Sequence, residues 1–204
     1  MMLASEDIVG SKSSIGVLRV LDGVSVALSI TQIARLAHLT RPAVISVLER
    51  LEQKGIVFLT RSGNARLYQL DRANIYVEKV ISPLFELEQN LLEHMTKDVS
   101  HVLGPLAVSI ILFGSFARGD QTQSSDVDIL VVAKDILKQK QVEHSLADYA
   151  SHFYRRFGHG LQALVYDFAQ ANQLSLRAPA LFAEIQEDGL LISGTSEWMK
   201  NEQE

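Results

Sequence analysis

The chain has 204 residues, of which 47% are hydrophobic and 21% are charged, as is ordinary for a soluble globular protein. It contains no cysteine, which excludes a disulfide framework and a thiolate metal site. No apolar run approaches the roughly 20 residues that a membrane-spanning helix needs, and the first residues lack the basic and apolar segments of a signal peptide. We therefore expect a cytoplasmic protein with no membrane partner.

The net charge of −5 is divided unevenly along the chain. Residues 1–75 carry nine Lys and Arg against six Asp and Glu, whereas residues 76–204 carry ten against eighteen. Duplex DNA attracts a basic surface and repels an acidic one. If the chain binds DNA, the first third is expected to do so.

The first third of the chain contains the start and stop signals of several short helices and strands. Apolar residues at helical spacing between Ser13 and Leu21 predict a first helix. Ser29 and Gln32 have the spacing of a capping box at the start of a second. Thr40 is suited to the N-cap of a longer helix that ends at Lys54-Gly55, and Pro42 fits its first turn. Two strand-like runs, 57–59 and 66–70, then flank the turn residues Ser62, Gly63 and Asn64.

This order of helices and hairpin is that of a winged helix-turn-helix. Residues 30–70 resemble the small bacterial and archaeal winged-helix regulators, and the resemblance includes the segment 47–57. The resemblance implies a transcriptional regulator that binds duplex DNA, although winged helices also serve as protein-contact modules. The helix from Arg41 to Lys54 would enter the major groove. The residues expected to contact DNA are Thr40, Arg41, Ser46, Arg50, Arg61 and Arg66.

Residues 75–97 form a longer amphipathic stretch, with apolar residues three and four positions apart. Pro83 interrupts it, which predicts a kink or two helices. One interpretation is a linker helix that covers apolar surface of either domain. The other is a dimerisation helix, because helix-turn-helix proteins usually need two half-sites. The second interpretation makes a homodimer the expected state.

The remaining chain predicts a small mixed-sheet domain. Strands are expected at 108–113, 126–132 and 161–166, with a helix at about 139–157 and shorter pieces up to residue 193. The expected fold class is therefore α+β. The expected division is a winged helix-turn-helix at 1–74, a linker or dimerisation helix at 75–97, the second domain at 98–194 and a tail at 195–204.

The second domain contains a motif that combines a turn with two carboxylates. Gly114 and Ser115 follow the first strand, and Asp126 and Asp128 occupy positions i and i+2 of the next, so both aspartates point to one face. Two such carboxylates repel each other unless a cation lies between them, and hard oxygen ligands suit Mg²⁺ beside substrate phosphates. A glycine allows close backbone approach to a phosphate, and a serine adds donors. Taken alone, either half of the motif is more often a turn or a solvated face.

Together, at this spacing, the two halves resemble the DNA polymerase beta-type nucleotidyltransferase superfamily. The match is closest to its minimal members, whose signature is Gly-Ser, about ten residues, then Asp-x-Asp. The resemblance implies that Gly114 and Ser115 hold a nucleoside triphosphate, and that Asp126 and Asp128 bind Mg²⁺ or Mn²⁺ and serve catalysis. Arg118 matches a basic residue that is common in this loop of the family, which implies a contact with phosphate. An ion pair with Asp120 is an equally good interpretation.

The family places a third carboxylate on the following strand. Here the matching position is Gln162, a neutral amide that cannot act as a base. Asp167 lies five residues further on and on the opposite parity, which makes it a poor substitute. The residues leave two interpretations open, a weak enzyme and a nucleotide-binding domain without catalysis.

The leading functional hypothesis is a DNA-binding transcriptional regulator whose attached nucleotidyltransferase-like domain binds a nucleoside triphosphate with Mg²⁺. The alternative is an active nucleotidyltransferase that moves a nucleoside monophosphate onto a protein or a small molecule, as the antitoxin-like members of the family imply. A third hypothesis, a scaffold of two degenerate domains, is disfavoured by the intact Gly-Ser and Asp-x-Asp.

Overall fold

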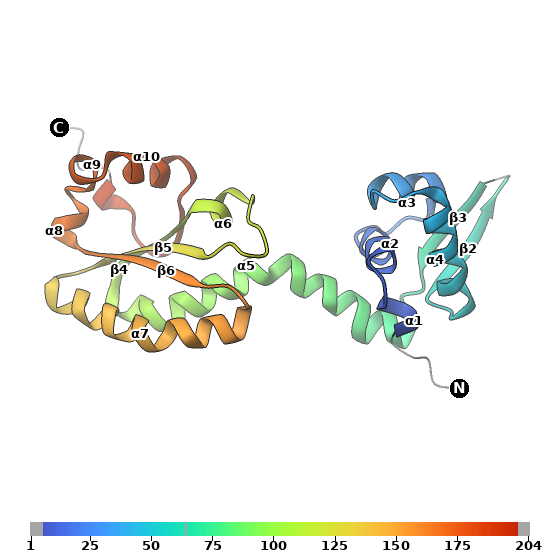
Figure 1. Cartoon of the computed structure of the whole chain (residues 1–204), viewed down its shortest axis with the longest axis horizontal. Helices are drawn as coiled ribbons and strands as arrows, with labels where there is room; N and C mark the ends of the chain where they lie inside the picture. The colour runs from blue at the N-terminus through green and yellow to red at the C-terminus, as the bar shows by residue number, and fades with distance from the viewer. Residues whose placement is uncertain (1–5, 64, 200–204) are drawn as a thin grey trace. The chain divides into compact units, whose positions relative to one another are not determined.

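The computed structural model describes residues 6–63 and 65–199. The chain divides into two compact units, Met1–Asn90 and Leu91–Glu204. The division falls inside the stretch 75–97 that the sequence marks as a linker or dimerisation helix. Both units combine helices with a sheet, so the predicted α+β class is confirmed (Figure 1).

The first unit has the elements of a winged helix-turn-helix. Its three antiparallel strands are ordered β1-β3-β2. The two-residue strand β1 is too short to leave a periodic signal, and the sequence did not predict it. The elements are α1 (Glu6–Val9), α2 (Lys12–Asp22), β1 (Leu28–Ser29), α3 (Ile30–Leu36), α4 (Arg41–Gln53), β2 (Val57–Ser62) and β3 (Ala65–Leu70).

The predicted helix starts and the apolar stripe of α4 are confirmed. Ser29 Oγ accepts a hydrogen bond from the backbone N–H of Gln32, whose side chain accepts in turn from Ser29 N–H. His38, in the turn between α3 and α4, has a left-handed φ of 53°. Asn64, expected in the hairpin turn, lies outside the described residues. The residues of α4 that are buried in the core are Val44, Val47, Leu48 and Leu51.

The predicted interruption at Pro83 appears as a change of helix type. A π-helical turn, Val77–Ile81, directly precedes α5 (Ser82–Leu103). Proline cannot donate the hydrogen bond that would continue an α-helical ladder. Phe85 of α5 is buried in the core of the first unit and Met95 in that of the second, which supports the linker interpretation. Since Val80, Leu84 and Leu87 are exposed, the homodimer stays a prediction.

The second unit is built on a four-stranded sheet of order β6-β5-β4-β7. Strands β5 and β6 are parallel and the other pairs antiparallel, so the sheet is mixed. Helix α7 covers one face, and α8 to α10 cover the other (Figure 1). The elements after α5 are a 3-10 turn (Gly104–Leu106), β4 (Ala107–Phe113), α6 (Gly114–Arg118), β5 (Val127–Ala133), α7 (Ile136–Phe157), β6 (Leu161–Asp167), α8 (Phe168–Ala171), α9 (Leu174–Arg177), α10 (Pro179–Asp188), β7 (Leu190–Gly194) and a second 3-10 turn (Glu197–Met199).

Alternate residues of the central strands serve different cores. On β5, Ile129 and Val131 pack toward α7, whereas Leu130 and Val132 pack toward α10. Side chains two residues apart on a strand share a face. Asp128 therefore belongs to the face that α10 covers, and this face is where the candidate site forms.

The segment expected as a tail is partly packed. Trp198, in the second 3-10 turn, is only 2% exposed and joins the core on the α10 face. Residues 195–199 are therefore part of the fold, and residues 200–204 lie outside the described part. No helix within 6–63 or 65–199 combines the length and apolar character needed to cross a membrane.

One partly buried hydrogen bond connects α7 to α5. The hydroxyl of Tyr149, a residue that is 6% exposed, donates to Asp98 Oδ2 at 2.6 Å. Burial raises the pKa of the Tyr149 phenol, and the hydrogen bond to Asp98 raises it further. The hydroxyl therefore stays protonated and acts as the donor. We predict that Tyr149→Phe destabilises the second unit by about 1 kcal/mol, the usual net value of such a bond.

The protein's single tryptophan makes the measurement selective, because Trp198 reports only on the second unit. Denaturant unfolding followed by its fluorescence should show a lower midpoint for Tyr149→Phe. Tyr154→Phe is the matched control, because Tyr154 lies on the same helix and is 60% exposed. Equal midpoints for Tyr149→Phe and the wild type would show that the bond adds nothing.

Candidate functional site

The first half of the motif is a sharp turn at the end of β4. Gly114 has φ +72°, a left-handed conformation that favours glycine, and the chain then enters α6. A Cβ at this position would lie 2.8 Å from Oδ2 of Asp128. Any other residue would meet both backbone strain and a clash with the carboxylate. Gly114 therefore allows Asp128 to lie directly against the backbone of the Gly-Ser turn.

A second glycine serves the other aspartate. A Cβ on Gly160, just before β6, would overlap the carboxylate of Asp126. The Gly160 carbonyl also accepts a hydrogen bond from Val127 N at 2.8 Å, at the start of the β5–β6 ladder. Gly160 was not among the predicted site residues, and its signal in the sequence is the run Gly158-His159-Gly160 before the third strand. Each aspartate thus lies against a glycine from a different segment.

Asp126 directly precedes β5 and Asp128 is its second residue, and the environment of Asp128 disfavours negative charge. Burial, then the charges of Asp126 and Glu184, raise the pKa of Asp128, while Arg118 opposes the shift. Carboxylates in such a place favour a bound cation, and their hard oxygens fit Mg²⁺ or Mn²⁺. Within the described residues, however, no cluster of three or more His, Cys, Asp or Glu is placed to hold a metal. A cation would be held by these two carboxylates.

The position expected for a third carboxylate lies in the site but carries an amide. Gln162 is the register partner of Asp128 on β6, and its Nε2 donates to Asp126 Oδ2 at 2.6 Å. Asp167 pairs with Ala133 at the other end of the same ladder. Its side chain caps α8 by accepting from Gln170 N at 2.8 Å. Asp167 is therefore a structural cap, remote from the aspartate pair.

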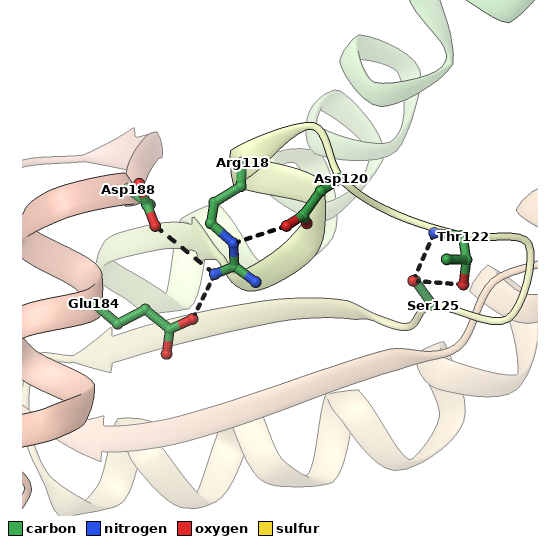
Figure 2. A network of polar contacts seen from close by, with 6 residues as sticks. All are labelled: Arg118, Asp120, Thr122, Ser125, Glu184 and Asp188. Carbon is green, nitrogen blue, oxygen red and sulfur yellow. Dashed lines mark hydrogen bonds and ion pairs between the residues drawn. The ribbon is translucent and has the colours of Figure 1, made fainter.

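The loop between α6 and β5 is fixed by its own hydrogen bonds. Thr122 N donates to Ser125 Oγ at 2.8 Å, and the two hydroxyls lie 3.1 Å apart (Figure 2). His159 Nδ1 lies 2.9 Å from the Ser125 carbonyl, and its ring packs edge-on against Phe116. His159 thus supports the loop that carries Asp126.

Arg118, at the end of α6, makes ion pairs with three carboxylates (Figure 2). Its Nε lies 3.3 Å from Asp120 Oδ2, the partner that the sequence suggested. Its Nη1 lies 2.8 Å from Glu184 Oε1 and 3.8 Å from Asp188 Oδ2, both on α10. Sequence reasoning missed these two partners because they lie more than 60 residues away along the chain.

The residues predicted to contact DNA divide into two groups. Arg50 points back into the first unit, where its Nη2 donates to Ser14 Oγ and its Nε is buried. This contact makes Arg50 a structural residue first, and it is the least accessible of the six. The exposed residues are Thr40, Arg41, Ser46, Arg61 and Arg66.

Known proteins resemble parts of this chain. Residues 73–165, a little under half of the chain, match the model of the nucleotidyltransferase domain family. Two candidate protein adenylyltransferases of Methanocaldococcus jannaschii are also similar. One is 34% identical over 90 residues, which is 44% of this chain and 59% of that protein. The other is 43% identical over 53 residues, 25% of this chain and 54% of that protein. The chain thus matches little more than half the length of these relatives.

Solved structures give more distant likenesses. A predicted DNA-binding transcriptional regulator from E. coli has a TM-score of 0.36 and 18% identity, over 43% of this chain and 84% of that one. A toxin–antitoxin structure with AMP-PNP has a TM-score of 0.35 and 21% identity, over 53% of this chain and 77% of that one.

The raised pKa of Asp128 predicts a pH-dependent effect on stability. A carboxyl whose pKa is higher in the folded state stabilises the fold when neutral, below its ordinary pKa of about 3.9. That stability is lost as the pH rises through the raised value. Asp128→Asn keeps an uncharged group, so without divalent cations it should be more stable than the wild type at pH 7. The difference should vanish toward pH 4 and below.

Unfolding followed by Trp198 fluorescence in a chelator, from pH 3.5 to 8, measures this difference. Asp148→Asn removes the same charge from an exposed position on α7 and should leave the profile unchanged. A variant Asp128→Asn that is less stable than the wild type at pH 7 would contradict the assignment.

Proposed function

We propose that the second unit binds a nucleoside triphosphate together with a divalent cation, and slowly transfers the nucleoside monophosphate to a protein hydroxyl. The observation that carries this proposal is the placement of Asp126 and Asp128 two residues apart at the start of β5, each against a glycine, with Asp128 beside the Gly-Ser turn. The family match over residues 73–165 supports the same chemistry.

Each residue has a proposed role in the transfer. Asp126 and Asp128 hold the cation, and Gly114 and Ser115 present backbone to the phosphates. The cation, when bound, would neutralise phosphate oxygens and so favour attack at the α-phosphorus. The acceptor hydroxyl forms a new P–O bond, the bond between the α- and β-phosphates breaks, and pyrophosphate leaves.

The rate of transfer depends on which group accepts the proton of the acceptor hydroxyl. A carboxylate on β6 would accept it, but Gln162 carries a neutral amide that already donates to Asp126. Positioned proton transfer contributes about 10²–10⁴-fold to rate, so its loss leaves binding intact and turnover slow. The relatives named as candidate protein adenylyltransferases support AMP as the group moved and a protein as the acceptor.

Nucleotide binding is expected to require the cation. Calorimetry with a non-hydrolysable ATP analogue should show binding with Mg²⁺ or Mn²⁺ and none in a chelator. Asp126→Asn should abolish it, because one carboxylate cannot hold the cation and the phosphates remain unneutralised. Asp148→Asn is the charge-matched control. Equal binding in the chelator, unaffected by Asp126→Asn, would remove the metal site from the proposal.

A companion measurement addresses transfer. ATP labelled at the α-phosphate is incubated with the protein and a mixture of acceptor proteins, and covalent label is followed. Gln162→Glu restores a carboxylate to the position beside Asp128 and should raise the rate of labelling. Fast transfer by the wild type that is insensitive to change at Gln162 would show that another residue takes the proton.

We also propose that the first unit binds duplex DNA as a transcriptional regulator. The favouring observation is in the wing, where Arg61 and Arg66 are directly opposite each other across the β2–β3 ladder. Like charges at opposed positions destabilise a hairpin. Both side chains are exposed, and a phosphate backbone lying across them would remove that repulsion.

DNA binding should therefore be salt-dependent and should depend on the exposed arginines. Arg61→Ala and Arg66→Ala together should reduce the slope of log affinity against log salt by about 2, since each phosphate contact contributes roughly 0.9. Arg41→Ala should also weaken binding. Arg50→Ala should lower the stability of the first unit instead, because it removes the hydrogen bond that Arg50 donates to the buried Ser14 hydroxyl.

Fluorescence anisotropy with a mixed-sequence duplex at several salt concentrations gives both affinity and slope. Lys12→Ala, which removes a positive charge from the start of α2, is the matched control. If the first unit has no affinity for duplex DNA even at low salt, the regulator proposal fails.

A further inference from the structure

The ion pairs of Arg118 connect the nucleotide site to a helix outside the matched family segment. The family match ends at residue 165, whereas Glu184 and Asp188 lie one turn apart on α10. Arg118 ends the short helix α6, which begins at Gly114, the residue that lies directly against Asp128, so the connection starts beside that aspartate. Figure 2 shows α10 presenting both carboxylates to the guanidinium.

These contacts fix the guanidinium from two directions. Asp120 accepts from Nε, while Glu184 and Asp188 lie against Nη1 (Figure 2). Within the described part of the chain, Nη2 makes no hydrogen bond or ion pair. An arginine fork has a rigid plane, so contacts at two of its nitrogens set the direction of the third. Nη2 is thereby left as an oriented donor.

Stability alone does not account for three carboxylates around one arginine. Exposed ion pairs contribute little to folding, and Arg118 and Asp120 are both exposed. Charge balance does not account for them either, because a single carboxylate would neutralise the guanidinium. What several partners provide is a restricted orientation, because a long side chain otherwise samples many rotamers.

We propose that Glu184, assisted by Asp188, is a positioning residue that holds Arg118 ready to donate through Nη2 to the triphosphate. This inference rests on the proposed nucleotide-binding function. It makes α10 part of the nucleotide site, and it resolves the two interpretations of Arg118: the ion pair and the phosphate contact operate together, through different nitrogens.

Three variants separate orientation from charge. Glu184→Gln keeps an oxygen that accepts from Nη1 but removes the charge, whereas Glu184→Ala removes both. Glu187→Ala removes a charge of the same sign from an exposed position on the same helix. Affinity for the ATP analogue with Mg²⁺ is measured by calorimetry. Glu184→Ala should weaken it about tenfold, in line with one charged hydrogen bond partly lost, while Glu184→Gln and Glu187→Ala retain it.

The other outcomes overturn the proposal. Tighter binding by both Glu184→Ala and Glu184→Gln would mean that the carboxylates restrain Arg118 by charge. Unchanged binding by Glu184→Ala would mean that Arg118 needs no support. Equal weakening by Glu184→Ala and Glu184→Gln would remove orientation as the cause.

A measurement without nucleotide separates this inference from the proposed function. Relaxation of the Arg118 side-chain nitrogens, by NMR on protein labelled at arginine, should show an ordered Nε in the wild type and in Glu184→Gln. The order should fall in Glu184→Ala. If the wild type binds no nucleotide but shows this pattern, the proposed function fails while the orientation of Arg118 stands. A mobile Nε in the wild type overturns the positioning role itself.

Discussion

The candidate site depends on one unfavourable interaction, the repulsion between two aspartates held at the start of a buried strand. Ionising Asp128 is opposed by burial and by Asp126, and its pKa is raised accordingly. The fold nevertheless brings backbone from two other segments against these carboxylates, at Gly114 and at Gly160. A side chain at either glycine would collide with the neighbouring carboxylate. The fold therefore holds each aspartate against backbone. A cation bound between the two carboxylates would relieve this repulsion, which is why we propose a cation site here.

The topology of the sheet determines what else reaches this point. Strand β5 is central, so the end of β4 and the start of the parallel strand β6 both meet its first residues. The side-chain alternation of the strand then directs the carboxylates to the face under α10 rather than to the face under α7. The Gly-Ser turn therefore lies against Asp128, and the amide of Gln162 lies against Asp126.

The sequence predicted the parts of this site that are local. Strand periodicity predicted that Asp126 and Asp128 share a face, although β5 begins only at Val127, and Gly114 was marked because it follows an apolar strand directly. Gln162 was located by counting along the next strand, and the register confirms it as the partner of Asp128. Gly160 and Glu184 were missed because their roles exist only after distant segments pack together. The burial of Trp198 was missed for the same reason, since a polar terminal stretch gives no periodic signal.

The excess of acidic residues in the second part of the chain bears on how a nucleotide could bind. Residues 76–204 carry eight more acidic than basic residues. Around the guanidinium of Arg118, the site and its surroundings include the carboxylates of Asp120, Asp126, Asp128, Glu184 and Asp188. A free triphosphate, itself strongly anionic, would be repelled by such a surface. A triphosphate that arrives with its divalent cation carries less negative charge, and the cation is attracted by the same carboxylates. Acidity that argues against nucleic acid binding by this unit is therefore compatible with nucleotide binding, provided that the cation and the nucleotide bind together.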